Sequence, residues 1–573
     1  MQTDPLAQLS FAEPTAHAVD LWAANLPLVN TAATAEQLLM ACDEMARLDA
    51  TAILRFDLLD TVRPLVHYVS SRLHRTASAT GPTAETLAAS LADAYGACFE
   101  SCRDKDMNDK ECRDILYRSA HRMFSEQGRL ALYCAQRYHS LPSGYWQYMH
   151  EAFAFLQQLE LTENKLADTN ESEQPTTVAH MYLRNLLFAS CKPNQINQQD
   201  LLYTFNVLEL WAQHASLEAP SHASLLLVDL QSDRGPVIRS KRRSDGDWRA
   251  LNAEILCYEA EAFVNEVNTI LPVPEYVTPK LIHHLVQAWS IVQPRNFRRI
   301  SSADKVRVSL GLRAVHYFLA GAVDFSEQIA NTDAVLRREV NPFLDVDYEP
   351  MSNKSDDDPW SYAHDLKTRI PENPNIENPD ALLRRHHTPA EKEPRKYDHY
   401  ELTAMDTSPG GYRLRWDEPM PAGVQVGDLV GLRDENDSRW CVAVLRWISG
   451  QGEFGEIGLQ LLAPRAIPVA VRLIQKKGGS AGYSRGLLLP GLEAIGQAAT
   501  MITPSLPFKA GQKIIIHRQG LQSTGMLQEV LLNTESFNQF SFRMLDGYLE
   551  NPARGRNMDA LSAMTREDST RGP

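Results

Sequence analysis

A carboxylate, a hydroxyl and a pair of glycines stand close together in the segment Asp406-Thr407-Ser408-Pro409-Gly410-Gly411. Asp406 can accept hydrogen bonds from a ligand, and Ser408 can donate or accept one. Gly411 allows the backbone to come close to a bound molecule. The same residue types also build ordinary hairpin turns, because Asp and Ser bond to neighbouring backbone groups while proline and glycine fix the bend. The segment alone predicts a turn and leaves a small-ligand clamp open as the alternative.

An alternating sequence follows this segment at once. Tyr412, Leu414 and Trp416 fall on one face, and Arg413 and Arg415 fall on the other, as in a half-buried strand. Further runs with strand character, separated by turn residues, are Leu429–Arg433, Trp440–Ile448 and Ile457–Leu462. The region after residue 397 is therefore predicted to be a sheet of short antiparallel strands.

The segment Asp406–Gly411 fits the signature [Asp/Asn]-x-Ser-x-x-Gly, and together with the strands after it this region resembles a PilZ domain. The resemblance implies a small antiparallel β-barrel. It also implies a ligand, because many PilZ domains bind the bacterial second messenger cyclic di-GMP. On this basis Asp406, Ser408 and Gly411 are predicted to bind the ligand. The family further requires an Arg-x-x-x-Arg motif upstream.

Arg295 and Arg299 have the required spacing, with Arg298 between them. The strand-like run Lys305–Leu310 follows after a short polar turn, and in PilZ domains the arginine pair likewise lies immediately before the first strand. The resemblance therefore assigns Arg295, Arg298 and Arg299 to the site. Arginine suits such a ligand because it binds phosphate oxygens with two N–H groups, pairs with guanine and stacks on a base.

Two other basic clusters are alternatives for the arginine motif. Arg239 and Arg243 have the right spacing, but a predicted helix, Trp248–Leu271, follows them where the family has a strand. The second cluster lacks the spacing but directly precedes the signature strand, where an uninterrupted domain would carry its arginines; it comprises Arg384, Arg385, Lys392, Arg395 and Lys396.

The chain has 573 residues, which is too long for a single core and predicts two to four domains. Apolar residues recur at helical spacing through the first half, in segments such as Ile53–His74, Ala84–Arg103, Glu111–Gln136 and Tyr145–Leu161. Between His222 and Ile238 this pattern is interrupted by a strand or loop.

The predicted fold is multidomain α plus β, with a helical N-terminal domain, a PilZ-like antiparallel β-barrel and a further β segment. The further segment is expected to be a second small barrel or extra strands on the first. The predicted divisions are a helical domain (1–290), the arginine segment with the first strand (291–320), a polar insertion (321–396), the PilZ-like barrel (397–467), the second β segment (468–550) and a disordered tail (551–573).

Composition limits the function. The formal net charge is −15, which argues against a nucleic-acid polymer as the main partner because such binders need a basic surface. No apolar run reaches the length of about 20 residues needed for a membrane helix, and the N-terminus lacks the layout of a signal peptide, so a cytoplasmic location is expected. The eight cysteines have no Cys-x-x-Cys spacing, and neither a metal nor a cofactor is predicted.

The sequence thus predicts a non-catalytic signalling effector that binds cyclic di-GMP and acts on a protein partner through its helical domain. The alternative is a PilZ-like adaptor that no longer binds nucleotide and uses its barrels only to dock partners, which the long insertion favours. An enzyme is not expected, because nothing in the helical region pairs a nucleophile with a base at a recognisable spacing.

Overall fold

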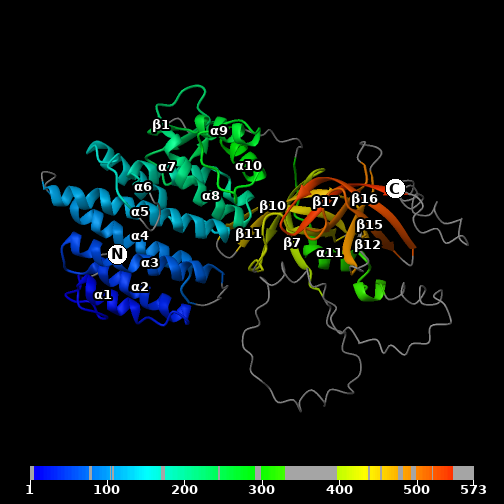
Figure 1. Ribbon diagram of the computed structural model, residues 1–573, viewed down its shortest axis with the longest axis horizontal. Coiled ribbons are helices and arrows are strands. Elements are labelled where there is room, and N and C mark those ends of the chain that lie inside the picture. Colours follow the sequence, from blue (N-terminus) through cyan, green and yellow to red (C-terminus); the bar gives the residue numbers. More distant parts are fainter. Residues whose placement is uncertain are drawn as a thin grey trace, which may run out of the picture. The chain divides into compact units, whose positions relative to one another are not determined.

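The computed structural model describes residues 5–75, 81–103, 105, 109–168, 174–242, 246–290, 299–329, 397–421, 423–435, 439–451, 454–474, 482–491, 498–518 and 521–545. The chain divides into two compact units. The helical unit comprises residues 1–295 with 449–452, and the barrel unit comprises residues 296–448 and 453–573. The predicted α plus β fold is confirmed, with helices in blue to green and the strands from β7 onward in yellow to red (Figure 1). The predicted tail, 551–573, and most of the predicted insertion lie outside the described residues.

Helices make up most of the helical unit. They are α1 (Ala16–Ala24), α2 (Thr31–Arg47), α3 (Ala52–Arg75), α4 (Ala84–Arg103), α5 (Lys110–Gln136), α6 (Tyr145–Gln158), α7 (Val178–Ser190), α8 (Gln198–Trp211), α9 (Glu254–Val264) and α10 (Pro279–Ser290). The four helical segments predicted from periodicity coincide with α3 to α6 within a few residues. The longest of the described helices, α5, is capped at its N-terminus by Asp109, whose side chain accepts a hydrogen bond from the Glu111 backbone N–H. Its second half is buried on nearly every side, so α5 is the centre of this unit.

A four-stranded antiparallel sheet interrupts the helices at the position where the sequence pattern changed. Its order is β1-β4-β2-β3, with β1 (Ser216–Glu218), β2 (Leu226–Asp229), β3 (Val237–Ile238) and β4 (Trp248–Asn252). The predicted helix Trp248–Leu271 is wrong in its first part, because Trp248–Asn252 pairs with β1 and β2 as a strand. The prediction also runs too far, because the helix that does form, α9, ends at Val264 and not at Leu271.

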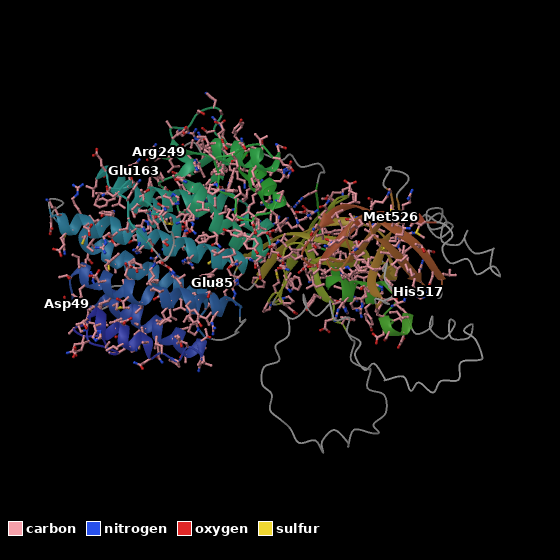
Figure 2. The ribbon with its side chains drawn as sticks, viewed as in Figure 1. Asp49, Glu85, Glu163, Arg249, His517 and Met526 are labelled. Atoms are coloured by element: carbon pink, nitrogen blue, oxygen red, sulfur yellow. The ribbon has the colours of Figure 1, made fainter. Side chains whose placement is uncertain are left out.

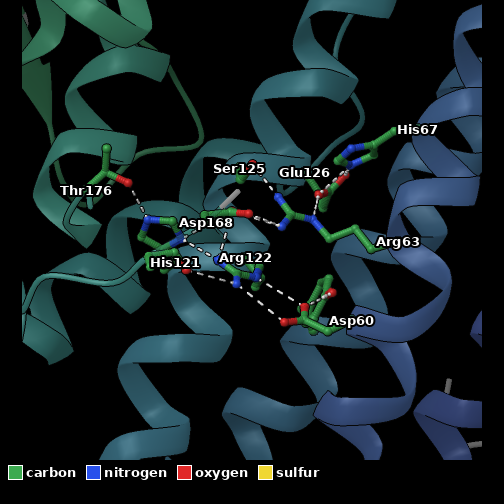
Figure 3. Close-up of polar contacts among 11 residues, drawn as sticks. Asp60, Arg63, His67, His121, Arg122, Ser125, Glu126, Asp168 and Thr176 are labelled. Carbon is green, nitrogen blue, oxygen red and sulfur yellow. Dashed lines mark hydrogen bonds and ion pairs between the residues drawn. The ribbon is translucent and has the colours of Figure 1, made fainter. Parts of the chain in front are cut away.

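A network of charged side chains is buried between α3, α5 and the loop after α6 (Figure 3). Arg63 donates through Nε to Glu126 at 2.6 Å and through Nη1 to Asp168 at 2.7 and 2.9 Å. Arg122 lies 2.8 Å from Asp168, and His67 contacts Glu126 at 2.9 Å. Burial alone would raise the pKa of Glu126, but the charges of His67 and Arg63 outweigh it and lower the pKa to about 2.

The first part of the barrel unit is a closed ring of six antiparallel strands. Its elements are β5 (Ile300–Ser301), β6 (Lys305–Leu310), α11 (Gly311–Leu319), β7 (Tyr400–Ser408), β8 (Gly411–Trp416), β9 (Leu429–Asp434), β10 (Cys441–Gln451) and β11 (Phe454–Ala463). The ring runs β7-β6-β9-β10-β11-β8 and closes by pairing of β8 with β7. The two-residue strand β5 pairs with the end of β7 beyond β6. The predicted barrel and its first strand are therefore present.

The predicted second β segment is a separate closed barrel. Its ring order is β12-β13-β14-β17-β16-β15, formed by β12 (Ile467–Leu473), β13 (Ser484–Leu489), β14 (Thr500–Pro504), β15 (Lys513–Arg518), β16 (Leu521–Asn533) and β17 (Phe537–Leu545). The strands β15 and β16 pair directly. Figure 2 labels one residue on each, the buried His517 on β15 and Met526 on β16. Of the two arrangements predicted for this segment, the structure has the second small barrel.

One apolar core joins the two barrels. Val315 of α11 packs with Leu429 and Val442 of the first barrel and with Leu487 and Phe537 of the second. All five side chains are almost completely buried. Helix α11 therefore lies between the barrels and holds them as one body, although the chain that forms them is predicted as separate segments.

Candidate ligand-binding site

The signature Asp406–Gly411 spans a tight β-hairpin. Asp406 and Ser408 lie at the end of β7, Pro409 and Gly410 make the turn, and Gly411 begins β8 opposite Ser408. The Ser408 hydroxyl donates to the Gly411 carbonyl at 3.2 Å and so stabilises the turn. The sequence prediction placed the whole signature in a turn. It was wrong for Asp406–Ser408, because pairing with β5 and β8 holds these residues in a strand.

Gly411 is required by a close approach of two backbones. A Cβ atom built on this residue would lie 1.9 Å from the carbonyl oxygen of Leu459 on β11, and the φ of Gly411 is +157°. The preceding residue, Gly410, accepts a hydrogen bond from the Leu461 backbone N–H. The hairpin therefore lies tightly against β11, and only glycine fits at position 411.

The structure brings Arg299 and Asp406 together. Ile300 and Ser301 of β5 pair with Thr407 and Asp406, so the residue just before β5 reaches the hairpin. The Arg299 guanidinium lies 2.9 Å from one carboxylate oxygen of Asp406 and donates to the other at 3.2 Å. The Arg299 side chain is 38% exposed and the Asp406 side chain 16%. The other two predicted arginines, Arg295 and Arg298, lie outside the described residues.

The alternative arginine clusters have different positions. Arg239 belongs to a short 3-10 helix of the helical unit, Arg239–Lys241, and donates to the Ser221 carbonyl. Its predicted companion, Arg243, and the cluster from Arg384 to Lys396 lie outside the described residues. Among the described arginines of the three clusters, Arg299 is the one that bonds to the hairpin, through Asp406.

Two further charged residues adjoin Asp406, and the sequence analysis did not assign them to the site. Arg413 of β8 lies 3.7 Å from the second carboxylate oxygen of Asp406. Its guanidinium also donates to both carboxylate oxygens of Glu456 on β11, at 2.7 to 3.1 Å. These hydrogen bonds raise the pKa of Arg413 above its ordinary value. Alternation had placed Arg413 on the polar face of its strand. However, its two partners depend on strand register, and that register shifts between Ala404 and Asp406.

The arrangement is a row of alternating charges on the barrel surface: Arg299, Asp406, Arg413 and Glu456. All four side chains are partly exposed, so a ligand from solvent can reach them. Such a row offers guanidinium groups for phosphate or guanine and a carboxylate for ligand N–H groups. No group of three His, Cys, Asp or Glu side chains in the described ranges is placed to hold a metal ion.

Comparison with protein families matches almost the whole chain to three models. The model of the N-terminal domain of the cyclic-di-GMP receptor FimW matches residues 17–222, and that of its middle PilZ domain matches residues 225–468. The model of the FimW C-terminal β-barrel domain matches residues 469–545. The middle match contains β5, the hairpin and all four residues of the charged row. Residues 225–468 therefore form a PilZ domain, as the sequence resemblance predicted.

A curated relative extends the similarity over the full length. The cyclic-di-GMP receptor FimW of Pseudomonas aeruginosa (strain PAO1) is 28% identical over 569 residues, which cover 93% of this chain and 91% of the relative. No solved structure matches the chain. Among the described helices, none is long and apolar enough to cross a membrane.

Proposed function

We propose that this protein is a cyclic di-GMP-binding signalling effector of the PilZ type, with its site at Arg299, Asp406, Ser408 and Gly411. The observation that carries the proposal is the bond between Arg299 and Asp406, because it joins the arginine segment to the signature hairpin. Arg295 and Arg298 would complete the site from the same segment. The similarity to a cyclic-di-GMP receptor over 93% of the chain supports the same ligand.

The chemistry of the site matches that ligand. Cyclic di-GMP carries two phosphates and two guanines; Arg299 can bind a phosphate or a guanine edge, and Asp406 can accept guanine N–H bonds. Each charge-assisted hydrogen bond contributes about 1.5–3 kcal/mol before ordering costs, which corresponds to a factor of about ten to more than a hundred in affinity. Several such contacts suffice for micromolar binding.

In this proposal the protein is a cytoplasmic sensor without catalytic activity of its own. The ligand would leave unhydrolysed, and a protein partner would read the signal through the helical unit. The proposed domain limits are those predicted from the sequence: a helical domain to residue 290, a barrel at 397–467 and a second β segment at 468–550. A ligand shifts the arrangement of such parts only by its difference in affinity for the two states.

Isothermal titration calorimetry of the full-length chain with cyclic di-GMP tests the proposal. We expect saturable binding by the wild type, loss of binding in Arg299→Ala, and strong weakening in Asp406→Ala. Arg307→Ala is the matched control, because Arg307 pairs with Glu401 on the surface of the same barrel. Calorimetry readily detects binding with a Kd of up to about 100 μM. If the wild type shows no binding when the ligand is at about this concentration, the nucleotide-free adaptor replaces this proposal.

A further inference from the structure

Asp406 is contacted by two guanidinium groups that differ in how they are held. Arg299 precedes a strand of only two residues, β5, and its side chain has bonds to Asp406. Arg413 lies inside β8, which pairs along its length with both β7 and β11. Its guanidinium is also fixed by three hydrogen bonds to Glu456. One arginine is thus at the loosely paired end of the site and the other is part of the barrel wall.

Ligand binding at this site can draw Arg299 away from Asp406, because both contacts between them use the same Nη1 group. A guanidinium that bonds to a carboxylate with its N–H groups has fewer of them left for a phosphate. If Arg299 transfers to the ligand, Asp406 loses its nearest positive charge. A carboxylate that is 16% exposed and left unpaired would be poorly placed to accept guanine N–H bonds in a defined direction.

We propose that Arg413, fixed by Glu456, is a positioning residue that keeps Asp406 paired and oriented when Arg299 moves to the ligand. This inference rests on the proposed function and adds Arg413 and Glu456 to the residues that determine affinity. Neither residue belongs to the arginine motif or to the signature. Glu456 bonds to Nε and Nη2 of Arg413 and so orients the guanidinium, with Nη1 facing Asp406 and not solvent.

A simpler role for the pair is a surface salt bridge that only supports the barrel. Exposed ion pairs of this kind contribute little to stability. The two roles differ in what happens when the charges are exchanged. Arg413→Glu combined with Glu456→Arg retains an ion pair between β8 and β11, but it places a carboxylate next to Asp406 in place of a guanidinium.

Calorimetry with cyclic di-GMP on four full-length proteins separates these roles: wild type, Arg413→Met, Arg413→Lys and the exchanged pair. We expect both Arg413→Met and the exchanged pair to bind at least about tenfold more weakly than the wild type. Arg413→Lys retains the charge beside Asp406 but loses the two-pronged bonding to Glu456, so its affinity should lie between those of the wild type and Arg413→Met. Thermal unfolding of each protein, followed by circular dichroism, checks that the barrel is intact.

The outcomes are distinct. Wild-type affinity in the exchanged pair would overturn the inference while leaving the proposed function standing, because the pair would then be structural only. An Arg413→Lys protein as weak as Arg413→Met would also overturn it. Absence of binding by the wild type would overturn the proposed function itself, and the inference with it. Should the exchanged pair fail to fold, the comparison of Arg413→Lys with Arg413→Met decides the question.

Discussion

The two units of this molecule use the same residue types in networks of opposite character. In the helical unit, Arg63, Glu126 and Asp168 have side chains that are at most 1% exposed, and they bond at 2.6 to 2.9 Å (Figure 3). On the first barrel, Arg299 and Arg413 flank Asp406 with side chains that are 38% exposed. The residue types are the same and burial is the main difference, while the contacts to Asp406 are also longer, at 2.9 to 3.7 Å.

Burial decides whether an ion pair can change partners. A charge taken out of water costs several kcal/mol unless its partner stays in place, so the buried network is locked into one arrangement. An exposed pair costs little to break, because water replaces the lost partner. The first network thus fixes helices, whereas the second can change partners at little cost, as the proposed ligand site requires.

The largest expected effect is the loss of one buried partner. Glu126→Ala leaves Arg63 buried without its Nε acceptor, and we expect a loss of about 3–5 kcal/mol in the free energy of unfolding of the helical unit. Chemical denaturation followed by circular dichroism measures this loss. The matched exposed variant, Arg299→Ala, should change stability by less than about 1 kcal/mol. Equal effects of the two variants would remove the distinction between the networks.

A second prediction concerns histidines, one in each unit. Burial lowers the pKa of His180 on α7 and of His316 on α11 to about 4 from an ordinary value of 6.5. The unfolded chain therefore binds a proton at pH values at which the folded chain does not, and stability falls as the pH drops from 6.5 towards 4. Each group accounts for up to about 3 kcal/mol of this loss.

His316→Gln makes this prediction specific to one unit. The His316 Nε2 nitrogen lies 3.2 Å from the Val469 carbonyl oxygen, and a glutamine amide can donate in its place. Urea unfolding at a series of pH values should show a flatter pH dependence for the barrel unit, while the helical unit keeps its His180 response. A variant with an unchanged pH profile in the barrel unit would argue against a neutral, buried His316.

The third prediction tests the packing of the signature hairpin. In Gly411→Ala the new Cβ would meet the Leu459 carbonyl at 1.9 Å, so β8 and β11 must separate locally. We expect a loss of about 1–3 kcal/mol in barrel stability together with weaker ligand binding. Gly482→Ala is the control, because a Cβ there has open space around it. If thermal unfolding gave the same result for both, the close approach of the two strands would be disproved.

The smallest effect expected is that of salt. Raising the ionic strength from about 0.1 M to about 1 M shortens the screening length from about 10 Å to about 3 Å. Binding of cyclic di-GMP should weaken several-fold, because its proposed contacts with the charged row are exposed to solvent and so are screened by salt. The stability of the helical unit should change far less, since the ion pairs of Arg63 are buried and salt screens buried pairs only weakly. Salt titrations of ligand affinity and of urea unfolding test both halves of the comparison.

Local pattern predicted most elements of the fold and part of the site. Helical spacing located α3 to α6, and runs with strand character located β8 to β11. The signature residues and Arg299 were found because their types and spacing resemble a known family. The strand β7 was not predicted, because Asp406 and Ser408 have turn propensity and only pairing with β5, β6 and β8 makes them extended.

The remaining errors have the same cause. Trp248–Asn252 carries no local signal strong enough to oppose the helical pattern after it, yet pairing with β1 and β2 makes it a strand. Arg413 and Glu456 are 43 residues apart, and their contact depends on the register of β8 against β11. Strand register is a property of the assembled sheet. Neither the pairing of Trp248–Asn252 nor the contact of Arg413 with Glu456 could therefore be predicted from the sequence alone.

The apolar core around α11 determines where this chain can be divided. The match to the middle PilZ domain ends at residue 468, but the core that contains Val315 and Leu429 is completed by Leu487, Ile502 and Phe537 from beyond that point. A truncation at the match boundary would leave one side of this core facing water and would favour aggregation. Exchange of barrels between relatives, in the laboratory or in evolution, therefore requires both barrels and α11 to be transplanted together.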